Sequence, residues 1–255
     1  MTTFTSRFAE NAYRPTFTRS LRSELTKLNT RTVQVTALIG VALYGLIMWF
    51  VATSAGEEPD PRIAVVGWSS LTFFFIIIGA VAATSEYAHN TMRTTALSDP
   101  RRPRSYAAKL AAVTIVSAVL SVVLLGVGLA ILSLRMDGFR VNGDGLEAYF
   151  AFVVLMTAIG VLSAAMGYLV RSTAGAIAIM IGFINLLDLV RLIPQRFFQE
   201  TVSQLIPSSL GNVAITGQAP TDALVSSPWA ALAIFVGYTV AGVVVGLVTF
   251  SKRDI

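Results

Sequence analysis

Six long runs of uncharged, mostly apolar residues constrain the fold of this chain more than any other feature of its sequence. A helix needs about 20 such residues to cross a hydrocarbon core of about 30 Å, and five of the runs reach that length on their own. The run that begins at Ser172 is shorter, and it suffices only if it continues to about Ile193 and includes Asp188 and Arg191. The predicted spans are residues 33–53, 63–84, 107–134, 148–170, 172–193 and 228–250.

The pattern within these runs favours helices over barrel strands. Only helices and closed barrels satisfy their backbone groups in lipid, and barrel strands alternate polar and apolar residues. These runs are continuously apolar, so we expect an all-α polytopic membrane protein with an N-terminal segment over residues 1–32 and one six-helix domain over residues 33–255. Only 13% of the residues are charged and cysteine is absent. This composition excludes a soluble globular enzyme, a disordered chain and a disulfide scaffold.

Positive charge is distributed unevenly among the segments that join the spans. Fourteen of the nineteen lysines and arginines fall in alternate segments that share one side: Arg7, Arg14, Arg19, Arg22, Lys27, Arg31, Arg93, Arg101, Arg102, Arg104, Lys109, Arg171, Lys252 and Arg253. The other side holds Arg62, Arg135, Arg140, Arg191 and Arg196. The positive-inside rule then predicts a multi-pass protein of the cytoplasmic (plasma) membrane with both termini in the cytoplasm.

The segment before the first span has the pattern of an amphipathic helix. Its apolar residues Phe17, Leu21, Leu25 and Leu28 recur at helical spacing, while the basic residues fall elsewhere. A basic amphipathic helix of this kind lies in the headgroup layer of a membrane. The alternative is a solvated basic tail that only enforces the topology.

The longest predicted cytoplasmic link, residues 85–106, has features of a docking segment. It opens with Glu86 at the end of the second span, continues without a helix breaker through Leu97, and meets Asp99-Pro100, which ends a helix. A basic turn of arginines follows. An ordinary positive-inside loop would explain the arginines but not Glu86.

Four motifs stand beside the spans: Arg22-Ser23-Glu24-Leu25-Thr26-Lys27-Leu28, Glu86-Tyr87 with Asn90-Thr91-Met92-Arg93-Thr94-Thr95, Pro100-Arg101-Arg102 with Ala108-Lys109, and Lys252-Arg253-Asp254. In their order and spacing the chain resembles the membrane subunit of ABC-2 type ATP-binding cassette exporters, in the small six-span form common in high-GC Gram-positive bacteria. The resemblance covers the whole chain through its span count and loop lengths, with Asn90 standing where such permeases often have glycine.

The resemblance implies roles for these segments. The amphipathic helix, with Arg22, Glu24 and Lys27, would be a connecting helix on the inner leaflet. Residues 194–227 would form a re-entrant helical hairpin near the outer face, broken at Pro207; the alternative is a plain surface loop. The link after the second span would be a short coupling helix that docks on a cytoplasmic ATPase (nucleotide-binding) subunit, through Glu86, Tyr87, His89, Asn90, Met92, Arg93, Arg101 and Arg102.

The sequence independently indicates that any ATPase is a separate chain. A P-loop needs a lysine after glycine-rich sequence, and none of the three lysines follows a glycine. ATP and Mg would therefore be bound by a partner, and we expect no cofactor on this chain. The single histidine, His89, excludes a histidine-containing triad or a multi-histidine metal site inside the membrane.

Several residues are candidates for the translocation path. Asp188 and Arg191 are three residues apart and can pair on one helix face, with Asn185 one turn earlier. They either line the path or form an interfacial ion pair. Phe73 and Phe74 on the second span are further candidates, although three successive aromatic residues must place at least one toward lipid.

The leading hypothesis is a non-enzymatic permease subunit that exports a hydrophobic or amphipathic substrate such as a drug, a peptide or a lipid-like molecule. The resemblance implies two permease chains, as a homodimer or heterodimer, with membrane lipid but no nucleic acid as a further partner. The alternatives are a self-contained secondary transporter or channel and a non-transporting membrane scaffold.

Overall fold

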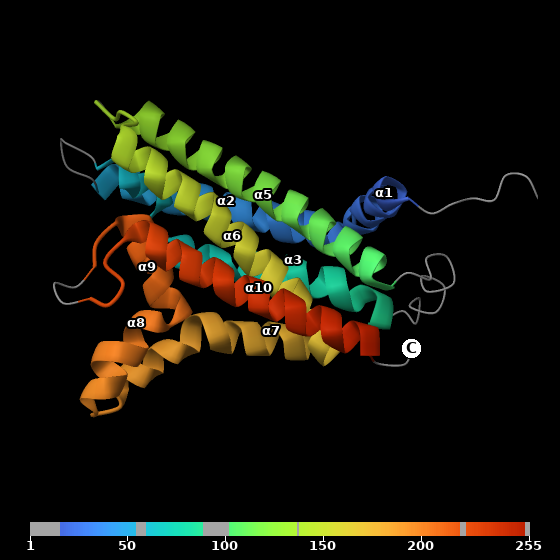
Figure 1. The fold of residues 1–255 in the computed structure, drawn as a ribbon. Helices are drawn as coiled ribbons and strands as arrows, with labels where there is room; N and C mark the ends of the chain where they lie inside the picture. The colour runs from blue at the N-terminus through green and yellow to red at the C-terminus, as the bar shows by residue number, and fades with distance from the viewer. Residues whose placement is uncertain (1–15, 55–59, 89–101, 137, 220–222, 253–255) are drawn as a thin grey trace, which may run out of the picture.

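Long helices make up this protein (Figure 1). The computed structural model describes residues 16–54, 60–88, 102–136, 138–219 and 223–252. Within these ranges there is no β-strand, and six helical segments are long and apolar enough to span a membrane. The elements are α1 (Phe17–Leu28), α2 (Arg31–Ser54), η2 (Pro61–Val65), α3 (Trp68–Ala88), α5 (Arg102–Arg135), α6 (Gly143–Val170), α7 (Thr173–Ile181), η3 (Gly182–Leu186), η4 (Leu187–Leu192), η5 (Phe197–Val202), α8 (Ser203–Leu205), α9 (Pro207–Thr216) and α10 (Pro228–Lys252).

The six predicted spans are confirmed as helical, and the second opens with a short 3-10 helix before its α-helix. We expected it to begin at Ile63, but Pro61–Val65 form a short 3-10 helix and the α-helix starts at Trp68. Asp60 caps the short helix by accepting a hydrogen bond from the backbone N–H of Arg62 at 2.8 Å. Gly67, with φ of +79°, then turns the chain, a conformation that favours glycine.

The fifth span is irregular in its second half. Regular α-helix ends at Ile181, a π-helical segment covers Gly182–Leu186, and a 3-10 helix covers Leu187–Leu192. Ile193 is extended because Pro194 follows it. Together these segments form the 20-residue candidate span Thr173–Leu192, so the prediction that this span runs on through Asp188 and Arg191 is confirmed.

Helix α6 lies at the centre of the bundle and packs against α3, α5, α7, α9 and α10. A Cβ atom added to Gly79 would clash with the backbone oxygen of Gly160, so α3 and α6 touch through their backbones. Beside this contact, the Ser163 hydroxyl donates a 2.6 Å hydrogen bond to the carbonyl of Ile76. Gly160 is therefore a helix-packing position.

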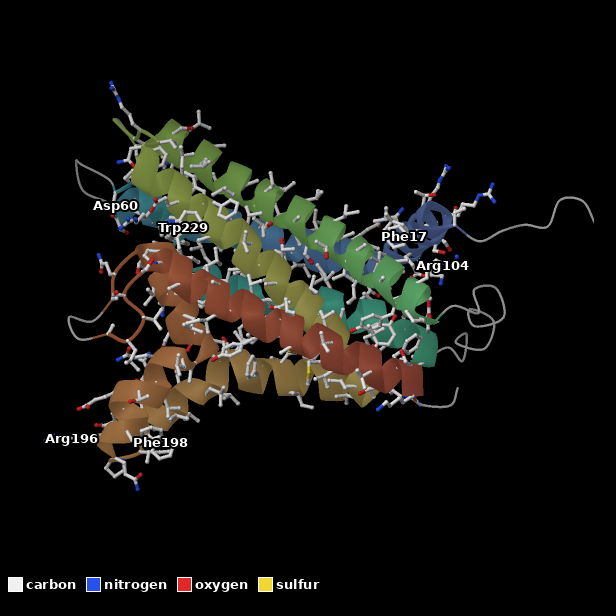
Figure 2. The ribbon with its side chains drawn as sticks, in the orientation of Figure 1. Phe17, Asp60, Arg104, Arg196, Phe198 and Trp229 are labelled. Carbon is white, nitrogen blue, oxygen red and sulfur yellow. The ribbon has the colours of Figure 1, made fainter. Side chains whose placement is uncertain are left out.

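Sequentially distant segments meet at the two ends of the bundle (Figure 1). At the α1 end, on the right of the view, α1 lies near the C-terminal ends of α3 and α10 and the start of α5. At the opposite α9 end lie η2, the start of α6 and the η5–α9 segment. Figure 2 shows the same division, with Phe17 and Arg104 at the first end and Asp60, Arg196, Phe198 and Trp229 at the second.

The segment between the fifth and sixth spans is helical rather than a plain loop. Short helices η5 and α8 precede Ile206, whose backbone is extended because Pro207 follows it. Pro207 then opens α9, which packs against α10 and α6. The predicted break at Pro207 is confirmed.

Candidate functional site

Four charged residues from three helices meet at the α1 end of the bundle. We call Glu24 and Lys27 of α1, Glu86 of α3 and Lys109 of α5 the charge cluster. The Nζ atom of Lys27 lies 2.7 Å from Glu24 Oε1 and 2.8 Å from Glu86 Oε1. The Nζ atom of Lys109 lies 2.8 Å from Glu24 Oε2 and 2.7 Å from Glu86 Oε1. Each lysine therefore bridges both carboxylates, and the cluster has no net charge.

The amphipathic pattern of α1 explains why the cluster forms. Leu21, Leu25 and Leu28 pack into a core shared with α3, α5, α6 and α10. Glu24 lies three residues after Leu21 and four before Leu28, so it shares their helix face. The face that buries the leucines therefore also buries Glu24, which is only 4% exposed. The basic residue Arg22 is on the exposed side.

Burial makes this cluster costly unless every charge is paired. Lys109 is 3% exposed and Glu86 is 6% exposed, and an unpaired charge at such a depth costs several kcal/mol. Burial by itself would lower the pKa of Lys27, but the carboxylates of Glu24 and Glu86 more than offset this and raise it. Lys27 is therefore firmly charged at neutral pH, and the ion pairs hold α1 to α3 and α5.

An aromatic layer packs beside the charge cluster. The ring of Tyr168 lies 4.8 Å from that of Tyr106 and 5.0 Å from that of Phe250, centroid to centroid. Tyr87 meets Tyr168 edge-on at 6.3 Å. The Tyr106 hydroxyl donates a 2.9 Å hydrogen bond to the carbonyl of Val243. These contacts join the ends of α3, α5, α6 and α10 into one packed unit.

Arg171 was not identified from the sequence as a functional residue, but it lies at the end of this unit. It is the C-cap of α6 and has a left-handed backbone with φ of 56°, which is uncommon for a residue other than glycine. Its guanidinium carbon is 5.4 Å from the centre of the Tyr87 ring, within cation–π range. Arg171 therefore ties the α6–α7 turn to the last turn of α3.

Only part of the predicted coupling segment falls in the described residues. Glu86 and Tyr87 occupy the last turn of α3, and Arg102 opens α5. Glu86, which the sequence predicts as a docking residue, is buried and paired with two lysines. The remaining predicted docking residues, His89, Asn90, Met92, Arg93 and Arg101, lie outside the described residues.

The candidate path residues are spread over different surroundings. Phe73 is 40% exposed, whereas Phe75 is fully buried. Phe74 lies between these extremes and packs against Gly40 of α2. The three aromatic residues thus cover much of the α3 circumference, and Phe73 is the one that faces outward.

Asp188 and Arg191 pair as predicted. Their Oδ1 and Nε atoms are 3.4 Å apart, and their side chains are 43% and 53% exposed. Arg191 also donates a 2.6 Å hydrogen bond from Nη2 to the Ser209 hydroxyl of α9. Asn185 lies in the π-helical segment, and its Nδ2 atom is buried without a hydrogen-bond partner among the described residues. The pair therefore links η4 to α9 at the edge of the bundle.

The geometry of the charge cluster suits the attachment of one helix to another, because its two carboxylates are both engaged by ammonium groups. The described part of the chain holds no group of three or more potential ligands for a metal ion. Its members lie on the two helices that border residues 89–101 and on the amphipathic helix. A force on that link would therefore reach all three helices.

No family model matches this sequence, and no curated protein matches it.

Proposed function

We propose that this chain is the membrane-spanning permease subunit of an ABC-2 type exporter, powered by ATP hydrolysis on a separate subunit. In this proposal it moves a hydrophobic or amphipathic substrate across the cytoplasmic membrane. The six apolar spans and the resemblance of the motifs support the proposal. The observation that carries it is the charge cluster, because it joins both ends of the predicted docking link to an amphipathic helix.

The proposal gives each part of the α1 end a mechanical role. The link over residues 85–106, with the docking residues from Glu86 to Arg102, is the coupling segment that the ATPase subunit binds. Motion of this segment pulls on the end of α3 and the start of α5, which are bonded to each other through Glu86 and Lys109. Helix α1 is the connecting helix on the inner leaflet, and it moves with them because Glu24 and Lys27 complete the cluster.

The rest of the molecule would form the path. Of the six spans, the first and the fifth are the least buried. Only 22% and 17% of the residues in their apolar 18-residue stretches are buried inside the protein. These exposed spans suit a path between two permease chains, with η5, α8 and α9 as the outer re-entrant hairpin. In this proposal the path is lined by the candidate residues Phe73, Asn185, Asp188 and Arg191. Phe74 instead packs within its own subunit against Gly40.

Copurification tests this proposal. The tagged chain, extracted from its native membrane in mild detergent, should bring down an ATPase-bearing subunit. Arg93→Ala should weaken that association, because Arg93 lies in the predicted docking segment, while Arg31→Gln removes an exposed cation at the start of α2 and should leave it intact. Recovery of the chain with no ATPase-bearing subunit would overturn the proposal.

A further inference from the structure

A cavity of about 980 Å³ opens at the α9 end of the bundle, far from the charge cluster. Its walls come from η4, η5, α8, α9 and the chain that precedes α10. Cavities of this size accommodate organic ligands. Most of the lining residues carry hydroxyl, amide or charged groups, and the apolar remainder lies on α9 and the segment 223–225.

Hydrogen bonds between the walls hold the cavity in shape. Arg191 donates to the Ser209 hydroxyl, which in turn donates to the carbonyl of Ser203 at 2.6 Å. The side-chain oxygen of Gln204 accepts a 2.6 Å hydrogen bond from the backbone N–H of Leu224. These bonds tie η4 to α9 and α8 to the chain before α10, so the lining groups are positioned before any ligand arrives.

Three of the lining residues have hydrogen-bonding groups that no other described residue uses. Among the described residues, the Glu200 carboxylate makes no ion pair or hydrogen bond, while Arg191 uses Nε and Nη2 and keeps Nη1 available. Asn212 accepts a 3.2 Å hydrogen bond from Trp68 on its oxygen, which leaves its amide nitrogen to donate. The cavity thus offers donors for an anion and a carboxylate for a cation.

The charge balance around the cavity selects the ligand class. Asp188 already shares the guanidinium of Arg191, so Asp188, Arg191 and Glu200 together carry one net negative charge. A bare anion such as phosphate is therefore disfavoured, whereas a ligand that pairs an anion with a cation matches both ends. A primary ammonium, with three N–H donors, suits the Glu200 carboxylate better than a quaternary ammonium, which has none.

The surroundings of the cavity are those of a membrane interface. Leu192, Phe197 and Leu224 are 76%, 63% and 65% exposed on the segments that border it. Trp229, at the same end in Figure 2, is of the residue type enriched where a bilayer meets water. A ligand seated here with apolar chains would have lipid-facing surface beside it.

We propose that this cavity binds the headgroup of a phospholipid-like amphiphile that carries a phosphodiester and a primary ammonium. Arg191 and Asn212 donate to the phosphodiester, and Glu200 accepts from the ammonium. Binding of this amphiphile to the cavity does not depend on the proposed function. That the amphiphile belongs to the class of transported substrates rests on the proposed function.

Lipid retention by the purified chain tests the inference. The chain is equilibrated in detergent with equal amounts of phosphatidylethanolamine and phosphatidylcholine, and the retained lipids are counted by native mass spectrometry. We expect phosphatidylethanolamine to be retained about tenfold more, the ratio expected for one charge-assisted hydrogen bond to Glu200. Glu200→Gln should reduce that ratio to about one, since the carboxylate is lost with no change in size.

Two controls show whether the lipid preference comes from this cavity and not from a general effect of charge. Glu147→Gln removes an exposed carboxylate at the same end of the bundle, outside the cavity lining, and should keep the preference. Soluble phosphoethanolamine at equal concentration should not displace the lipid; displacement would overturn a lipid as the ligand. Equal retention by the unaltered chain, or a preference that survives Glu200→Gln, would overturn the site. The assay contains no ATPase subunit, so such a failure is distinct from a failure to copurify one.

Discussion

At the scale of single residues, the charge cluster is the feature that departs most from the behaviour of an average membrane protein. Lysine and glutamate are expensive within or beside a bilayer, yet Lys109 and Glu86 are almost fully buried. The cost is offset because each ammonium contacts two carboxylates and each carboxylate contacts two ammonium groups. Removal of one member therefore leaves an excess buried charge, not only a missing contact.

Lys109→Met should destabilise the protein by about 3–5 kcal/mol, because it leaves two buried carboxylates with only Lys27 between them. The matched control is Lys252→Met, which removes an exposed lysine at the same end of the bundle and should change stability little. The measurement is the free energy of unfolding in mixed detergent micelles. Equal losses in both variants would show that the cluster contributes nothing beyond general charge.

The sequence predicted the helix that carries Glu24 and Lys27 but not the cluster itself. The leucine spacing was enough to predict α1, and Glu86 was noted because a carboxylate at a span end is unusual. The meeting of Glu24 with Lys109 depends on how α1 folds back against α5, a tertiary arrangement that no local pattern specifies. Arg171 was missed for a similar reason, since its contact with Tyr87 joins two turns that are far apart in the sequence.

At the scale of helices, the bundle depends on one close backbone approach. Gly79 and Gly160 allow α3 and α6 to touch, and Gly160 also faces Ser117 of α5. Small residues at such a position permit the packing on which helix association in lipid depends. By contrast, a Cβ atom added to Gly237 of α10 would meet no other element within 4 Å.

Gly79 and Gly237 give a matched pair of substitutions. Gly79→Ala should cost about 1–3 kcal/mol, because its methyl group would be forced against the Gly160 carbonyl. Gly237→Ala should be neutral or stabilise by up to about 1 kcal/mol, since it gains helix propensity without a clash. Thermal unfolding midpoints in one detergent distinguish the two. A loss at Gly237 as large as that at Gly79 would contradict the packing described for α3 and α6.

Helix lengths and the chain's apolar patterning could be predicted well, while irregular backbone could not. The π-helical and 3-10 segments that complete the fifth span have the same apolar composition as a regular helix. The start of the second span at Trp68 reflects the turn at Gly67, and glycine alone does not specify a positive φ. By contrast, the helix breaks before Pro194 and Pro207 can be predicted from the sequence, because the residue before a proline favours extended backbone.

At the scale of the whole molecule, the spans place α1 and the end of α10 at one end of the bundle and the start of α6 and η5 at the other (Figure 1). The charge distribution predicts that the first end is cytoplasmic. The chain has no cysteine, so single-cysteine variants report on each position without background. Exposed positions suited to this are Thr18 and Lys252 at the first end, and Val141 and Gln195 at the second.

A membrane-impermeant maleimide should label Val141→Cys and Gln195→Cys on intact cells. Thr18→Cys and Lys252→Cys should react only after the membrane is permeabilised, because the positive-inside rule puts that end in the cytoplasm. Labelling is read as a mass shift of the purified chain. Reaction of Thr18→Cys on intact cells would reverse the orientation and with it the assignment of the coupling segment.

The central claim is that an external ATPase drives this chain through the charge cluster, and ATPase stimulation tests it most directly. The rate of ATP hydrolysis by the copurified subunit is measured with and without the permease in proteoliposomes. Glu24→Gln combined with Lys27→Met keeps the net charge and the Lys109–Glu86 pair but removes the ion pairs of α1. We predict stimulation by the unaltered chain and by Arg31→Gln, and its loss in the double variant despite normal membrane insertion. Stimulation unchanged in the double variant, or absent from the unaltered chain, would contradict the claim.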